Sequence, residues 1–222
     1  DTVNPTVGIT SSQDGQVAYD GANSVTYTLT FDEAVQSVTA ADIDVTGAAL
    51  DENGAAVYSV AHTADSASAT VTVTVADGST DNVTVKAKPS IIDIAGNPLI
   101  TNTHNTQEVD TVNPSTIVAA GQTTNPVVSD AVITDDDNGT TLTVSFTFSE
   151  PMDQTTIPTV SFTPDVATTL TSPSGSWTDA QTFVTTAAVV DTGDDVLGVD
   201  VDQVTIDITG ARDVAGNDQQ DH

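Results

Sequence analysis

The sequence contains an internal repeat with a period near 110 residues. The string DTVNP occurs at residues 1–5 and again at residues 110–114, and the string D-(I/V)-A-G-N occurs at residues 93–97 and 213–217. The two DTVNP copies are 109 residues apart and the two D-x-A-G-N copies are 120 apart, so the second repeat has eleven additional residues between these landmarks. A repeat of this period predicts two domains of about 100 residues, each with its own core.

The local pattern predicts β-strands rather than helices. Val and Thr alternate over residues 70–75, and long segments with helical periodicity are absent. Short alternating segments separated by Gly- and Asn-containing turns are typical of an immunoglobulin-like sandwich. The predicted fold is therefore all-β, with two tandem immunoglobulin-like β-sandwich domains at residues 1–109 and 110–222. Only five residues follow Asn217, so we expect the last strand of the second domain to be short or truncated.

The expected strands follow from the same alternation and from the turn signals between them. In the first domain they are 6–10, 24–31, 43–45, 56–62, 67–75, 82–88 and 99–109. In the second domain they are 115–119, 141–148, 159–162, a stretch over 176–190, and 203–209.

The charge balance is strongly acidic. The chain has 32 Asp and Glu residues against three Lys and Arg residues, which gives a formal net charge of −29. Nucleic acids and anionic membrane surfaces would be repelled, so neither is an expected partner. The carboxylates would also repel one another. Either divalent cations neutralise them, or the acidic surface keeps the protein soluble at high salt concentration.

Other classes of site find little support in the sequence. The chain has no Cys, which excludes disulfides and thiolate metal sites. It has no apolar segment of membrane-spanning length and no signal peptide, and we expect it to be a piece of a longer protein.

No motif for nucleophilic, zinc-dependent or phosphate-binding catalysis occurs, and His62 and His104 lack partners at metal-binding spacing. We therefore expect no enzymatic activity. Trp177 either stacks on a sugar or fills the core of its domain.

Four motifs together carry a family resemblance. They are DTVNP, then TFDEAV at 30–35 or TFSEPM at 147–152, then TAADIDVTG at 39–47, and finally IIDIAGNPL at 91–99 or ARDVAGND at 211–218. This series resembles the bacterial immunoglobulin-like repeats of giant RTX-type surface adhesins, over essentially the whole chain. Two departures are that residues 32–35 read DEAV where the family often has SEPV, and that the second repeat has no clear counterpart of residues 41–44.

The resemblance implies a function and a location. Such repeats form calcium-stiffened extender stalks that are exported by type I secretion and project a distal binding domain from the bacterial surface. We therefore expect an extracellular, monomeric segment whose partners are neighbouring repeats of the same polypeptide. An alternative is that the second repeat recognises a glycan or a host protein through its longer segment 151–179. A third possibility is an accessory module of a secreted hydrolase.

The immunoglobulin-like topology would also gather oxygen ligands at the poles of each domain. Ca²⁺ binds six to eight oxygens from carboxylates, amides, backbone carbonyls and water. In the first domain, one pole would hold Asp1, Glu33, Asp93 and Asn97. The same pole of the second domain would hold Asp110, Glu150, Asp213 and Asn217, facing acidic loops of the first domain that include Asp77 and Asp81.

The far pole of the second domain would carry the densest acidic loops, with Asp135, Asp137, Asp194 and Asp195. They resemble a half-site for a following module. Simpler interpretations remain open for each motif. D-x-A-G-N could be only a turn, Glu33 and Glu150 could be solvated, and DTVNP could be a stiff linker.

Overall fold

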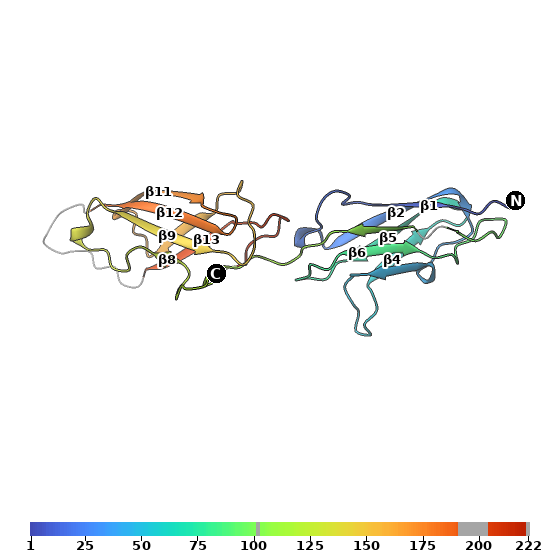
Figure 1. Ribbon diagram of the computed structural model, residues 1–222, viewed down its shortest axis with the longest axis horizontal. Coiled ribbons are helices and arrows are strands. Elements are labelled where there is room, and N and C mark those ends of the chain that lie inside the picture. Colours follow the sequence, from blue (N-terminus) through green and yellow to red (C-terminus); the bar gives the residue numbers. More distant parts are fainter. Residues whose placement is uncertain (101–102, 191–203, 221–222) are drawn as a thin grey trace. The chain divides into compact units, whose positions relative to one another are not determined.

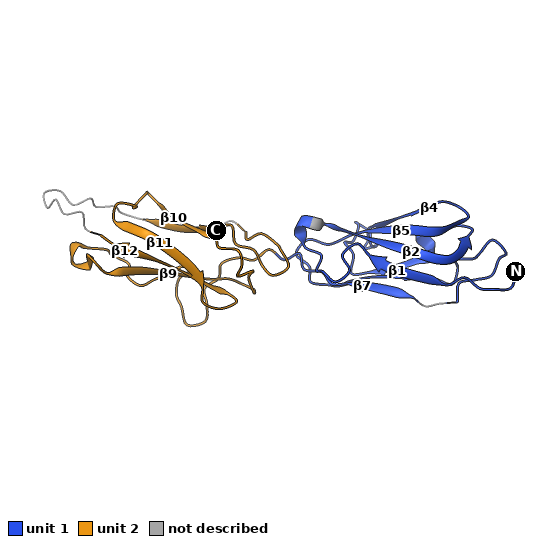
Figure 2. Cartoon of the chain, turned by 90° about the horizontal axis from the view of Figure 1, so that it is seen from above, with its two compact units in different colours: residues 1–112 blue, residues 113–222 orange. Residues whose placement is uncertain are grey.

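The computed structural model describes residues 1–100, 103–190 and 204–220 (Figure 1). Its contacts divide the chain into two compact units, Asp1–Val112 and Asn113–His222, which Figure 2 shows in separate colours. Antiparallel sheets form both units, so the all-β prediction is confirmed. The helices of the described residues are short 3-10 turns, and none is long and apolar enough to cross a membrane; they are η1 (Asp20–Ala22), η2 (Ala40–Asp42) and η3 (Asp135–Asp137).

Unit 1 contains two antiparallel sheets. One sheet has the order β1-β2-β5-β4 and the other has the order β3-β6-β7. The alternation in the sequence predicts all seven strands, although the last is shorter than the expected 99–109. Their bounds are β1 (Val7–Ser11), β2 (Ser24–Val35), β3 (Ile43–Thr46), β4 (Tyr58–His62), β5 (Ser66–Thr74), β6 (Val83–Ala87) and β7 (His104–Gln107).

Side chains from both sheets form the core of unit 1. Val71 and Val73 of β5 are fully buried, and so are Val83 and Val85 of β6, while the alternate positions of these strands stay partly or fully exposed. Each buried Val contributes about 1.5 to 3 kcal/mol. The two sheets share one apolar cluster, which is compatible with a β-sandwich.

Unit 2 has a similar sheet order. Its larger sheet has the order β8-β9-β12-β11, which matches the order β1-β2-β5-β4 of unit 1. A second, two-stranded sheet is formed by β10 and β13. Phe146, Phe148 and Ile208 are fully buried in its core. The strand bounds are β8 (Val127–Val128), β9 (Thr141–Thr147), β10 (Thr159–Thr163), β11 (Leu170–Trp177), β12 (Thr182–Val189) and β13 (Thr205–Thr209).

One strand prediction for the second repeat is wrong. Residues 115–119 form only an isolated bridge, from Thr116 to Phe148, and Val127–Val128 pairs with β9 instead. The Asn125 side chain bonds both the N–H and the carbonyl of Thr147, and this carbonyl also accepts the Ile117 N–H at 2.8 Å. The stretch expected over 176–190 contains the end of β11 and all of β12. It divides between β11 and β12 at a turn where Asp179 accepts a hydrogen bond from the Gln181 N–H at 2.8 Å.

Candidate metal centre

The D-x-A-G-N motif of unit 1 forms a tight turn that fixes the carboxylate of Asp93. One oxygen of Asp93 accepts the Asn97 backbone N–H at 2.8 Å, and the other accepts Asn97 Nδ2 at 2.7 Å. Gly96 has a φ of +93°, a left-handed conformation that favours glycine. The Asp93 N–H in turn donates to the Asn97 carbonyl at 3.0 Å. The turn therefore holds a carboxylate that is only 1% exposed.

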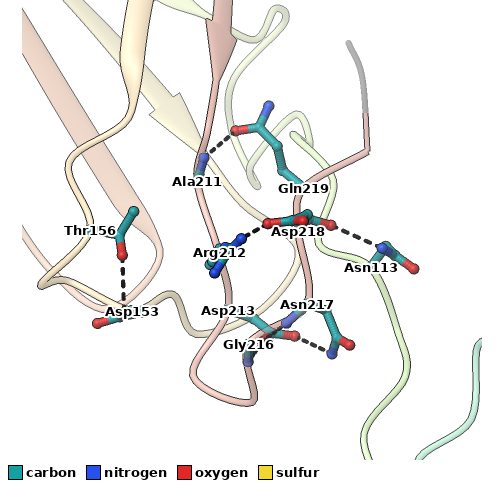
Figure 3. Close-up of polar contacts among 10 residues, drawn as sticks. All are labelled: Asn113, Asp153, Thr156, Ala211, Arg212, Asp213, Gly216, Asn217, Asp218 and Gln219. Atoms are coloured by element: carbon teal, nitrogen blue, oxygen red, sulfur yellow. Dashed lines mark hydrogen bonds and ion pairs between the residues drawn. The ribbon is translucent and has the colours of Figure 1, made fainter. Parts of the chain in front are cut away.

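The same turn recurs in unit 2 around Asp213. Its Oδ1 accepts the N–H groups of Gly216 at 2.6 Å and Asn217 at 2.9 Å, and its Oδ2 accepts Asn217 Nδ2 at 2.7 Å (Figure 3). Asp213 and Asn217 are both 1% exposed. An ion pair flanks the turn, from Arg212 Nε to Asp218 Oδ1 at 2.6 Å (Figure 3). The motif therefore forms the expected turn in both repeats.

Strand β2 brings Glu33 to the turn of unit 1. The expected strand 24–31 would end before Glu33 and leave it in a loop, which is wrong, because β2 continues to Val35, which forms a bridge with Asp93. The carboxylates of Asp1, Glu33 and Asp93 each offer an oxygen, and these oxygens all lie within 4.8 Å of one another. Asp1 is exposed, Glu33 is partly buried and Asp93 is buried.

Unit 2 repeats part of this arrangement. Met152, two residues after Glu150, forms a bridge with Asp213, just as Val35 does with Asp93. Glu150 and Asp213 also offer oxygens within 4.8 Å of each other. The motifs T-F-x-E and D-x-A-G-N therefore place a Glu beside a buried Asp in both repeats.

The carboxylates of unit 1 meet the spacing that a calcium ion requires. Calcium–oxygen distances are about 2.3 to 2.6 Å, so two oxygens on one ion are at most about 5 Å apart. Asp1, Glu33 and Asp93 satisfy this limit. They supply fewer oxygens than the six to eight that Ca²⁺ takes, unless they bind in bidentate fashion, so backbone carbonyls and water would complete the shell.

Hydrogen bonds favour the ionised form of the buried Asp93. Burial raises the pKa of Asp93, but the hydrogen bonds from the side chain and backbone of Asn97 and from the turn backbone outweigh it, so the pKa lies below its ordinary value. Asn97 Nδ2 donates to Asp93 and approaches the Asp1 carbonyl at 3.5 Å. In this arrangement Asn97 positions the carboxylate of Asp93 through its amide nitrogen.

The other predicted ligands include Asp110 and acidic residues of the loops. Asp110 belongs to unit 1, where its N–H donates to the Ala18 carbonyl at 2.8 Å and its Oδ1 accepts the Val112 N–H at 3.2 Å. In the part of the chain that the structure describes, no group of three acidic side chains suited to one ion includes Asp77, Asp81, Asp135 or Asp137.

Asp137 is engaged locally. Its Oδ2 accepts the N–H and the hydroxyl of Thr134 at 2.7 and 2.8 Å, and these bonds lower its pKa. Asp194 and Asp195 lie outside the described residues.

Trp177 and His62 have packing partners. The Trp177 ring lies between Phe148 and Phe183, with centroid distances of 5.5 and 5.2 Å, and its Nε1 donates to the Thr156 carbonyl at 2.9 Å. Trp177 therefore packs against the core of unit 2, as the second of its two interpretations expects. Nδ1 of His62 accepts the Val38 N–H at 3.2 Å, which ties the end of β4 to the segment after β2.

Comparison with known proteins gives no relative from which a function could be transferred: no protein-family model matches the chain, and no characterised protein matches it in sequence.

Proposed function

We propose that this chain is a non-enzymatic, calcium-stiffened extender segment of a bacterial cell-surface adhesin, built from two tandem immunoglobulin-like domains. The observation that carries the proposal is the group formed by Asp1, Glu33 and Asp93 at the D-x-A-G-N turn. These residues belong to the same motifs that carry the sequence resemblance. The larger sheets of the two units have matching strand orders, which supports equivalent folds for the two repeats.

The repeat extends the proposal to the second domain. Asp110 occupies the position of Asp1 in its DTVNP motif, and Glu150 and Asp213 occupy those of Glu33 and Asp93. We propose that the second set also binds Ca²⁺, with Asp110 supplied by the segment that links the repeats. An ion held by the linker and the following domain would restrict their relative motion, whereas the uncompensated carboxylates would repel one another.

The function requires only a modest affinity. Extracellular calcium modules bind with dissociation constants of about 10⁻⁴ to 10⁻³ M, which suits environments that contain millimolar calcium. At a net charge of −29, neutralisation of even a few carboxylates per domain reduces self-repulsion. The proposed work of the segment is mechanical: it holds a distal binding domain away from the cell.

Thermal melting with calcium and with EDTA tests the proposal, together with small-angle scattering on the same samples. We expect calcium to raise the melting temperature and to narrow the distribution of interdomain distances. Equal melting temperatures and equal scattering profiles in both conditions would contradict calcium stiffening. A glycan array with the same chain tests the alternative, because an extender should give no signal.

A further inference from the structure

We propose that Thr111, the Thr of the second DTVNP motif, is a clamp that fixes the linker to unit 1. Movement between the two units is then confined to the bonds around Val112 and Asn113. The boundary between the units falls inside the motif, between these two residues. The clamp consists of hydrogen bonds within unit 1, so it does not require calcium.

Thr111 binds the loop that follows β5 with both its backbone and its side chain. Its N–H donates to the Ser79 carbonyl at 2.9 Å, and its carbonyl accepts the Gly78 N–H at 3.2 Å. Its hydroxyl donates to the Ala76 carbonyl at 2.7 Å and accepts the Ser79 N–H at 2.9 Å. The hydroxyl therefore acts as donor and acceptor at once, which an apolar side chain of the same shape could not do.

The residues on either side of Thr111 are restrained as well. The Asp110 N–H donates to the Ala18 carbonyl at 2.8 Å, and the Ala18 N–H donates to the Glu108 carbonyl at 3.0 Å. Oδ1 of Asp110 accepts the Val112 N–H at 3.2 Å, a local turn that restrains the backbone of Val112. The linker thus remains bonded to unit 1 through Thr111, and a calcium ion bound by Asp110 would act on a residue that unit 1 already holds.

The Asn of the same motif is bonded to unit 2. Asn113 Nδ2 donates to the Asp218 carbonyl at 3.0 Å (Figure 3). In the first copy of the motif, Asn4 Nδ2 donates to the Pro98 carbonyl at 2.8 Å. Asp218 and Pro98 each follow D-x-A-G-N directly. The Asn of DTVNP therefore binds the same position of its own domain in both repeats.

Few rotatable bonds remain between these two anchors. The peptide bond between Val112 and Asn113 is planar, and Pro114 biases Asn113 toward an extended backbone. By comparison, a free linker of the length of DTVNP would have a root-mean-square end-to-end distance of about 12 Å. The clamp therefore reduces the movable part of the motif to two residues.

Distances between spin labels, one in each unit, measure this freedom. The chain has no Cys of its own, so labels can be attached through Thr30→Cys and Ser176→Cys, both at exposed positions. The distances are measured by double electron–electron resonance on the full chain in EDTA, so the result does not depend on calcium binding.

Three altered chains are compared with the parent chain that carries the two labels. The first is Thr111→Val, and the second is the matched control Thr2→Val, at the same position of the first motif copy, where Thr2 is exposed. The third has Gly-Ser inserted between Val112 and Asn113, which supplies free linker residues.

We expect the parent chain to give a narrower distance distribution than the chain with the insertion. Thr111→Val should broaden the distribution toward that of the insertion, and Thr2→Val should leave it unchanged. Thr111→Val should also make the Ser79 amide exchange about tenfold faster, because this N–H loses its acceptor. Unchanged exchange of the Val71 and Val73 amides shows that unit 1 remains folded.

Equal widths in the parent chain and the chain with the insertion would overturn the clamp, and this comparison does not require Thr111→Val to fold. An unchanged width in Thr111→Val, or equal broadening by Thr2→Val, would overturn the assignment of the clamp to Thr111.

Discussion

The substitution Glu33→Gln separates a calcium ligand from a solvated strand residue. Glu33 has two acidic neighbours with oxygens within 4.8 Å, Asp1 and Asp93. Each like-charged pair at about this distance costs about 1 kcal/mol with the dielectric constant of water, which is the appropriate value because Glu33 is partly exposed. Removing the charge of Glu33 should therefore stabilise calcium-free unit 1 by up to about 2 kcal/mol.

Calcium should reverse this sign. For a dissociation constant of about 1 mM, 10 mM Ca²⁺ stabilises the wild-type unit by about 1.4 kcal/mol, or roughly 6 to 11 °C in melting temperature for a domain of this size. If Glu33→Gln weakens binding about tenfold, the same calcium concentration contributes only about 0.4 kcal/mol, or roughly 2 to 3 °C. The variant should thus melt higher than wild type in EDTA and gain much less from calcium.

Differential scanning calorimetry of the full chain measures both effects. Trp177 is the only Trp and lies in unit 2, so its fluorescence identifies the transition of that unit. The matched control is Glu52→Gln, which removes the same charge from an exposed turn outside the acidic group. A calcium-induced shift of the unit 1 transition that is the same in wild type, Glu33→Gln and Glu52→Gln would refute a role for Glu33 in binding.

Three further substitutions test the fold. Tyr27→Phe removes a buried hydroxyl that donates to a β6 carbonyl at 3.0 Å, and should lower the free energy of unfolding of unit 1 by about 1 to 2 kcal/mol in urea titrations. Gly47→Ala should cost at least about 2 kcal/mol, because Gly47 has a φ of +77° and a Cβ there would collide with backbone atoms of a neighbouring strand. Gly54→Ala is its control, since Gly54 has the same φ with open space around it, and should cost only about 1 kcal/mol. The N–H of Thr6 donates to Asp32 at 2.7 Å and lowers the pKa of Asp32. The pKa of Asp32 is lower in the folded than in the unfolded state, so the hydrogen bond contributes fully to stability above about pH 4. Its contribution is lost as the pH falls through the folded pKa. Asp32→Asn should therefore flatten the loss of stability below about pH 4 in acid titrations followed by circular dichroism.

Alternation predicts the strands of unit 1 because both of its sheets bury one face. Over β5, Val71 and Val73 are buried while Thr70 and Thr72 lie on the other face, so a period of two is visible in the sequence. The segment 115–119 shows the same composition without the same result. Its contact with the end of β9 is limited to one bridge, with the Ile117 N–H on the Thr147 carbonyl and the Ser149 N–H on the Ser115 carbonyl. The Asn125 side chain, six residues after the segment, also binds Thr147, and no local pattern reports such a contact.

The candidate site was accessible from the sequence for a different reason. The repeat identifies Glu33 and Asp93 as landmarks of the sequence. They come together because Val35, at the end of β2, forms a bridge with Asp93. The contact of Asn97 with Asp93 could not be predicted, because an amide offers both a donor nitrogen and an acceptor oxygen. In the structure the nitrogen donates to Asp93.

This orientation makes Asn97→Asp informative. The new carboxylate would place an oxygen where Nδ2 now lies, 2.7 Å from Asp93 Oδ2, so it would replace a hydrogen bond with a repulsive contact between two anions. In EDTA the melting temperature of unit 1 should fall, and by more than in Asn97→Ser, which loses the bond without adding a charge.

Calcium should restore most of the loss in Asn97→Asp and little of it in Asn97→Ser, because only the former adds a ligand oxygen beside Asp93. Equal calcium rescue of both variants would contradict an ion at this turn. In both copies of D-x-A-G-N the turn fixes the carboxylate, and the oxygen that accepts the Asn side chain keeps a lone pair for an ion. The structural and metal-binding interpretations of the motif are therefore compatible.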